Sequence, residues 1–122
     1  MKRILNMSNH TLTGEQVAEL SGMGYEIVEL TAEDKTLWGK LNPSNYKEFT
    51  YRTMEDSDTR YDVDAYHIAG FPPAVVNAVC LACTLDMPAF YAYSERVSEE
   101  IHQPDGTVKK VNVFKHLGFF NY

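Results

Sequence analysis

The chain has no apolar run approaching the ~18 residues that span a membrane, and its first residues lack the apolar core and cleavage site of a signal peptide. It also lacks an excess of basic residues. The formal net charge is −6, whereas coating duplex nucleic acid requires a broad basic face. We therefore expect a cytoplasmic protein that binds neither membrane nor duplex nucleic acid. With 122 residues and 44% hydrophobic content, residues 1–122 are predicted to form a single domain.

Cysteine is scarce, and metal-ligating residues are not clustered. The two cysteines, Cys80 and Cys83, have the C-x-x-C spacing of some redox and zinc sites. They lie inside an apolar helical pattern and no second ligand pair follows, so we interpret them as buried structural thiols. The acidic residues 55–60 lack the central glycine and final glutamate of an EF-hand, so the sequence predicts no metal site.

Apolar patterning predicts alternating strands and helices. Strands are expected at residues 2–7, 25–30, 64–69 and 89–93, and helices from about Thr13, at 34–41, at 44–54 and at 74–83. A C-terminal hairpin is expected from 97–102 and 107–114 around the turn Asp105-Gly106. The last helix is apolar almost all round and is expected to be buried on most sides. This order predicts an α/β fold with a mostly parallel central sheet flanked by helices.

Polar side chains fill the turn after the first predicted strand. They are Ser8, Asn9, His10 and Thr11. Thr13 and Gln16 match a capping box, so the helix begins just after these residues and its free N–H groups and dipole attract anions. Open α/β sheets place their ligand sites at such turns. The alternative is that these residues only shape the turn.

A second turn of the same kind follows the central strand. Gly70 permits a tight turn or a close approach of ligand to the backbone, and Phe71 and two prolines lead into the next helix. In a parallel sheet with right-handed crossovers, both turns emerge at one edge. The two loops are therefore predicted to share one ligand.

Positive charge is concentrated toward the C-terminus. Residues 107–122 contain three lysines and no acid. Arg96 follows the predicted strand 89–93, where its planar donors suit a phosphate, although an ion pair with Glu95, Glu99 or Glu100 is the alternative. The aromatic end, residues 119–122, is interpreted as packed core or a subunit interface.

Taken in order, several short motifs resemble the small stand-alone ring nucleases of type III CRISPR systems. They are Asn9-His10-Thr11-Leu12-Thr13, Gly70-Phe71-Pro72, Tyr93-Ser94-Glu95-Arg96, Asp105-Gly106 and Phe114-Lys115-His116 with the aromatic tail. The resemblance spans the chain and implies a CARF-like, Rossmann-related domain. It also implies a homodimer that binds cyclic tetra-adenylate across its two-fold axis and cleaves it, which switches off the second messenger of these systems.

The implied reaction needs no metal or other cofactor. A ribose 2′-hydroxyl attacks its own 3′ phosphorus and leaves a 2′,3′-cyclic phosphate. His10 would be the general acid or base, with Ser8, Asn9 and Arg96 as further catalytic residues. The remaining expected ligand contacts are Thr11, Gly70, Phe71, Ser94, Lys115 and His116. Two alternatives stay open: a protein that sequesters the ring without cleaving it, and an unrelated Rossmann-like nucleotide-binding protein.

Overall fold

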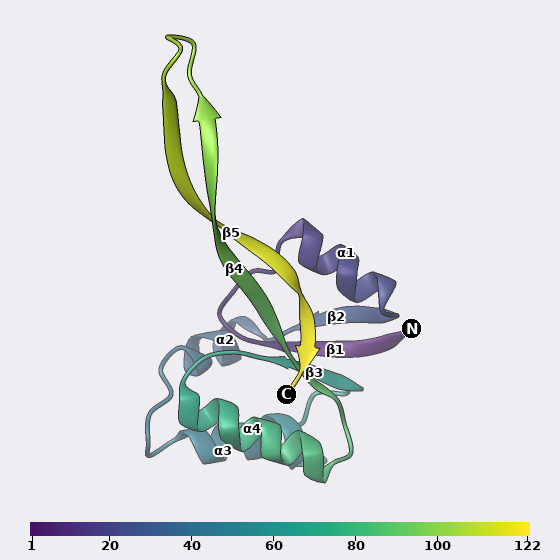
Figure 1. The fold of residues 1–122 in the computed structure, drawn as a ribbon. Helices are drawn as coiled ribbons and strands as arrows, with labels where there is room; N and C mark the ends of the chain where they lie inside the picture. Colours follow the sequence, from purple (N-terminus) through teal and green to yellow (C-terminus); the bar gives the residue numbers. More distant parts are fainter.

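The computed structural model describes residues 1–122 and has an α/β architecture (Figure 1). Its elements are β1 (Lys2–Met7), α1 (Gly14–Gly22), β2 (Tyr25–Glu29), α2 (Ala32–Trp38), α3 (Tyr46–Thr50), the π-helical turn η1 (Tyr51–Glu55), β3 (Ala65–Ile68), α4 (Pro72–Thr84), β4 (Ala89–His102) and β5 (Val108–Asn121). The five strands form one sheet in the order β2-β1-β3-β4-β5. Four strands are parallel, and β5 is antiparallel to β4, so the predicted mostly parallel sheet flanked by helices is confirmed.

The helices cover both faces of the sheet and define two apolar layers. On one face α1 packs through Leu20 against Ile4, Ala65, Phe90 and Phe119. On the other face α2, α3 and α4 enclose a larger cluster that includes Trp38 and Phe49. No helix has the length and apolar character needed to cross a bilayer.

The local signals in the sequence fix several element ends. Thr13 caps α1 by accepting a hydrogen bond from the Gln16 N–H at 3.2 Å, and the Gln16 side chain accepts one from the Thr13 N–H at 3.0 Å. The predicted capping box is therefore confirmed. The prolines of α4 occupy its first positions, where the lost N–H has no intrahelical partner, as expected.

Helix α4 corrects two of our predictions. Only its alanine face is buried, through Ala74, Ala78 and Ala82. The outer face is open to solvent: Val76 is 63% exposed, and the free thiols Cys80 and Cys83 are exposed as well. The predictions of burial on most sides and of buried thiols are therefore wrong. Small alanines let the helix approach the sheet closely, and no further layer lies outside it.

The C-terminal hairpin is longer than predicted. The expected strand 89–93 and the first hairpin strand form one continuous β4, and the aromatic tail extends β5 as far as Asn121. The tip is the predicted turn: Gly106 has φ +87°, and the Gln103 N–H donates to the Thr107 carbonyl at 2.9 Å. Beyond the sheet body the two strands project as a narrow arm (Figure 1). We call residues 94–116 the arm.

Candidate functional site

A pocket of about 400 Å³ lies at the carboxyl edge of the parallel strands. Asn9 and His10 come from the loop after β1, and Ala69, Gly70 and Phe71 come from the loop after β3. The remaining wall is formed by Trp38, Gly39 and Leu41 at the end of α2. The two loops that the sequence singled out therefore line one pocket, which we call the edge pocket.

The loop that carries His10 is held by a buried hydrogen-bond network beneath it. The Asn6 side-chain N–H donates to the His10 carbonyl at 3.0 Å and to the Glu29 carboxylate at 3.1 Å. The Ser8 hydroxyl donates to Asn6 Oδ1 at 2.7 Å and accepts from the His10 N–H at 3.2 Å. Ser8 is completely buried, so its hydroxyl shapes the loop and does not face the pocket. Asn9 and His10 are exposed.

His67, on β3, completes this network from the neighbouring strand. Its Nδ1 lies 2.8 Å from Asn6 Oδ1. Because the amide nitrogen of Asn6 donates elsewhere, Oδ1 accepts here, and His67 therefore carries its proton on Nδ1. Burial, with a smaller contribution from the charge of His10, lowers the pKa of His67 from 6.5 to about 4. His67 is thus neutral at pH 7 and supports the His10 loop from below.

Trp38 and Gly70 shape the opposite side of the edge pocket. The Trp38 indole N–H donates to the Ala69 carbonyl at 3.0 Å, which ties the end of α2 to the loop after β3. Gly70 has φ +154°, and a β-carbon there would lie 2.7 Å from Trp38 Nε1. Both the backbone conformation and the contact with the indole therefore require glycine.

An open groove of about 510 Å³ adjoins the edge pocket and shares Asn9 and Gly39 with it. Its other lining residues are Ala32, Lys35, Thr36 and Lys40. Lys35 and Lys40 form no ion pair, so both ammonium groups are available to an anion. Sequence reasoning missed these lysines because nothing in their local pattern distinguishes them from ordinary surface lysines. Only the packing of α2 beside the β1 loop brings them to the site.

The C-terminal residues expected in the site lie elsewhere in the chain. Arg96 and Ser94 are exposed within β4, opposite Phe114 and His116 of β5. Arg96 does not follow the end of a strand as predicted, because β4 continues to His102. It forms none of the expected ion pairs with its acidic neighbours.

Lys115 and Thr11 also lie outside the edge pocket, the first opposite Glu95 on the arm and the second exposed in the β1 loop. The His116 side chain is largely buried between β5 and α1. Its Nε2 lies 3.4 Å from Glu19 Oε1 without forming a hydrogen bond, and its ring packs edge-on against Phe119. The structure thus brings together Asn9, His10, Gly70 and Phe71 and leaves the other predicted contacts outside the pocket.

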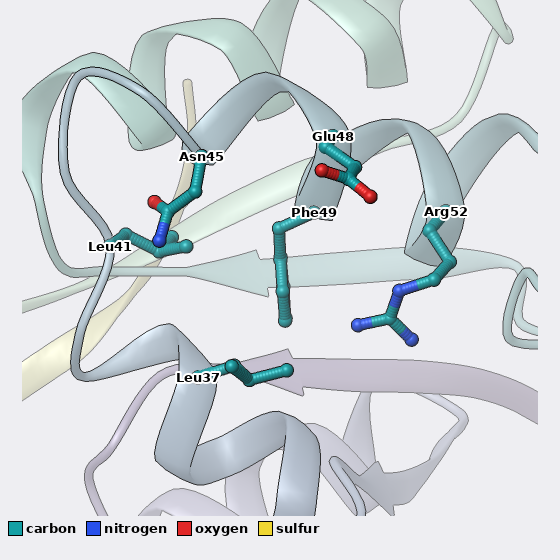
Figure 2. Close-up of a pocket in the computed structure, with 6 residues that line it drawn as sticks. All are labelled: Leu37, Leu41, Asn45, Glu48, Phe49 and Arg52. Carbon is teal, nitrogen blue, oxygen red and sulfur yellow. The ribbon is translucent and has the colours of Figure 1, made fainter.

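A third, smaller pocket of about 180 Å³ opens between α2 and the helix formed by α3 and η1 (Figure 2). Phe49 projects toward Leu37, and Asn45 and Arg52 stand at opposite ends (Figure 2). Leu41 belongs to both this pocket and the edge pocket. The two cavities are therefore neighbours.

An ion pair fixes the Arg52 end of this pocket. Arg52 donates to Asp34 at 2.9 Å, and the Tyr61 hydroxyl donates to the same carboxylate at 2.6 Å. Burial acts to raise the pKa of Asp34, but the hydrogen bonds from Arg52 and Tyr61 outweigh it and hold that pKa below its usual value. The network therefore anchors α2 to the segments that follow it.

Comparison with known proteins identifies the family of this chain. No curated protein and no solved structure matches the chain. One family model, described as the uncharacterized protein MJ1673 family, matches residues 2–120. Since the match covers nearly the whole chain, including both loops of the edge pocket and all of the arm, the chain belongs to the MJ1673 family.

Proposed function

We propose that this protein is a ring nuclease that binds cyclic tetra-adenylate with a CARF-like, Rossmann-related domain and opens the ring. The observation that carries the proposal is the position of His10. Its exposed side chain stands in a pocket built by two strand-to-helix loops, and two unpaired lysines line the adjoining groove. This combination supplies a proton-transfer group and positive charge at the sheet edge where α/β domains bind nucleotides.

The proposed reaction uses a nucleophile that the substrate itself provides. The ribose 2′-hydroxyl attacks the adjacent 3′ phosphorus, and the bond from phosphorus to the 5′ oxygen of the next adenosine breaks. The products end in a 2′,3′-cyclic phosphate and a 5′-hydroxyl. His10 accepts the proton of the 2′-hydroxyl, and the leaving 5′ oxygen takes up a proton from solvent or from a second group. This chemistry requires neither a metal nor another cofactor.

Positive charge in the groove supports binding of the ring phosphates. Lys35 and Lys40 lie next to Asn9, which lines both cavities, so a phosphate in the groove would be adjacent to the His10 side chain. In a chain of net charge −6, such a local basic site favours a small anion over a long polyanion. Thr11, Ser94, Arg96, Lys115 and His116 remain proposed contacts to parts of the ligand that extend beyond the edge pocket.

The ring has rotational symmetry, so we propose that a cytoplasmic homodimer holds it on the two-fold axis. Residues 9–11 of both copies would face the ring, with the buried Ser8 holding their loop from behind, because a two-fold interface repeats each contact on both sides. This domain would then end type III CRISPR signalling by removing the messenger.

Sequestration without cleavage is the second candidate function. One observation favours it: His10 is the only acidic or basic residue among those that line the edge pocket. A site with one such group can bind the ring tightly and still lack a proton donor for the leaving oxygen.

Incubation of the purified protein with cyclic tetra-adenylate in EDTA tests the proposal. Linear adenylates with 2′,3′-cyclic phosphate ends are expected after separation by chromatography and mass measurement. Intact ring in a tight complex would establish sequestration instead. Absence of binding would contradict both candidate functions.

A further inference from the structure

Beyond His116, which packs against α1 at its base, the arm has no packing partner within its own chain. At its base β4 pairs with β3 only at Ala89 and Phe90, and beyond Tyr93 its only neighbour is β5 (Figure 1). An isolated two-stranded hairpin is marginally stable in water. We therefore expect an arm of this length to be stabilised by another surface that packs on one of its faces.

One face of the arm carries an apolar stripe. Strand alternation places Val97, Ile101, Val111 and Val113 on this face, where Val97 lies directly opposite Val113. Ile101 is 48% exposed although it is a large aliphatic residue. The neighbouring positions Ser98 and Asn112, which lie opposite each other, point to the other face.

The stripe continues onto the sheet body. A bulge at Leu117 shifts the register between Tyr93 and Ser94, so that Tyr91 and Tyr93 share their face with Phe120. Tyr122 packs on Tyr91 with ring centroids 5.1 Å apart, and Phe120 packs on both Tyr91 and Tyr93. These rings stay accessible: Tyr93 is 44%, Phe120 46% and Tyr122 50% exposed.

The opposite face of the same segment is already occupied. Phe90 and Phe119 are buried beneath α1, and the Glu19 carboxylate accepts the Phe119 N–H at 2.8 Å. The continuous apolar strip thus lies on one side of the β4–β5 ladder. The other face of the arm exposes two separate apolar residues, Phe114 and Val108, with Lys110 and Asn112 between them along β5. We call the eight residues Tyr91, Tyr93, Val97, Ile101, Val111, Val113, Phe120 and Tyr122 the apolar strip.

We propose that a second copy of this chain covers the apolar strip, with the two arms parallel and β4 of each lying on β5 of the other. The charges on this face favour a second copy as the partner, because each strand carries one sign of charge. Glu95 and Glu99 lie on β4, whereas Lys109 and Lys115 lie on β5.

A two-fold axis parallel to the arms sets Val97 against Val113 of the partner subunit and Glu95 against Lys115 of the partner subunit. In an antiparallel stack, Lys109 would instead lie against Lys115 of the partner subunit, and these like charges repel each other. The strip is therefore self-complementary in one orientation, and a contact of this kind repeats on both sides of the axis. The inference concerns a surface distant from the edge pocket and does not rest on the proposed function.

Light scattering of the protein without ligand tests the interface. We expect twice the 13.9 kDa chain mass for the wild type. Val113→Glu should raise the dimer dissociation constant roughly a hundredfold or more, because it buries an unpaired charge in the strip. Asn112→Glu adds the same charge one residue away on the other face and should remain dimeric. A wild-type mass of 13.9 kDa, or a dimer that survives Val113→Glu, would overturn the proposal.

Disulfide trapping tests the orientation without a disruptive charge. In a Cys80→Ser, Cys83→Ser background, Val97→Cys chains mixed with Val113→Cys chains should cross-link rapidly under mild oxidation. Each variant alone should cross-link at least tenfold more slowly. Equal rates in the mixture and in the separate variants would contradict the parallel arrangement, and circular dichroism of each variant confirms that it is folded.

Discussion

The side chain of His67 donates from Nδ1 to Asn6 Oδ1 at 2.8 Å, a hydrogen bond between two neighbouring parallel strands. The same Asn6 oxygen accepts from Ser8, and the Asn6 amide supports the His10 carbonyl. One buried asparagine therefore joins β3, β1 and the loop that presents His10. Protonation of His67 would therefore affect the loop that carries His10 through Asn6.

Folding stability should depend on pH through His67. Its pKa is about 4 in the folded protein and 6.5 when unfolded, so between these values the unfolded chain binds more protons. The free energy of unfolding should fall by about 3 kcal/mol as the pH drops from 7 to 4. Urea denaturation across this range measures the effect. The His67→Gln variant has no imidazole at this position, so its free energy of unfolding should fall less between pH 7 and pH 4. An equal fall in both proteins would exclude His67 as the cause.

Gly70→Ala should destabilise the protein by about 2 kcal/mol, because it combines a strained backbone with a clash against the Trp38 indole. Gly24→Ala is the matched control. Gly24 also has positive φ, +91°, but has open space around its β-carbon position, so about 1 kcal/mol is expected there. Thermal unfolding with Trp38 fluorescence compares the two. Equal losses would show that the indole contact contributes nothing.

Lys40→Ala and Lys35→Ala should each weaken binding of cyclic tetra-adenylate roughly tenfold, the usual effect of losing one charge-assisted hydrogen bond. Lys47→Ala removes an exposed lysine of α3 outside both cavities and should leave affinity unchanged. Isothermal titration at fixed salt distinguishes them. If all three variants lost affinity alike, the effect would come from net charge and not from the groove.

Arg96→Ala should weaken ring binding by about 1.5–3 kcal/mol if the arm contacts the ligand. It should leave the free energy of unfolding unchanged, since Arg96 forms no ion pair in the fold. Titration calorimetry and urea denaturation of the same variant separate these effects. Unaltered affinity would remove Arg96 from the proposed contacts.

Sequence patterns predicted the features that depend on neighbouring residues. The capping box of Thr13 and the Asp105-Gly106 turn are local, and both appear as expected. The exposure of Cys80 was missed because an apolar helix gives no periodic signal that marks its buried face. The sequence did not predict that β4 is continuous from Ala89 to His102. Ser94 and Arg96 lie in the solvent-exposed arm, where no buried face imposes an apolar alternation that would mark a strand.

Tertiary packing decided the rest of the candidate site. Nothing in the sequence places Lys35 and Lys40 next to Asn9, because this proximity arises from α2 crossing beside the β1 loop. The same packing places Trp38 against Gly70 and explains why this position requires glycine. From the sequence alone, Gly70 is attributed only to a tight turn or to the approach of a ligand.

A single-turnover assay tests most directly whether His10 transfers a proton in ring cleavage. His10→Ala should slow opening of bound cyclic tetra-adenylate by roughly two to four orders of magnitude and leave ring affinity largely unchanged. His102→Ala, which removes an exposed histidine of the arm, should react at the wild-type rate. A His10→Ala protein that cleaves bound ring as fast as the wild type would contradict the proposed catalytic role of the edge pocket.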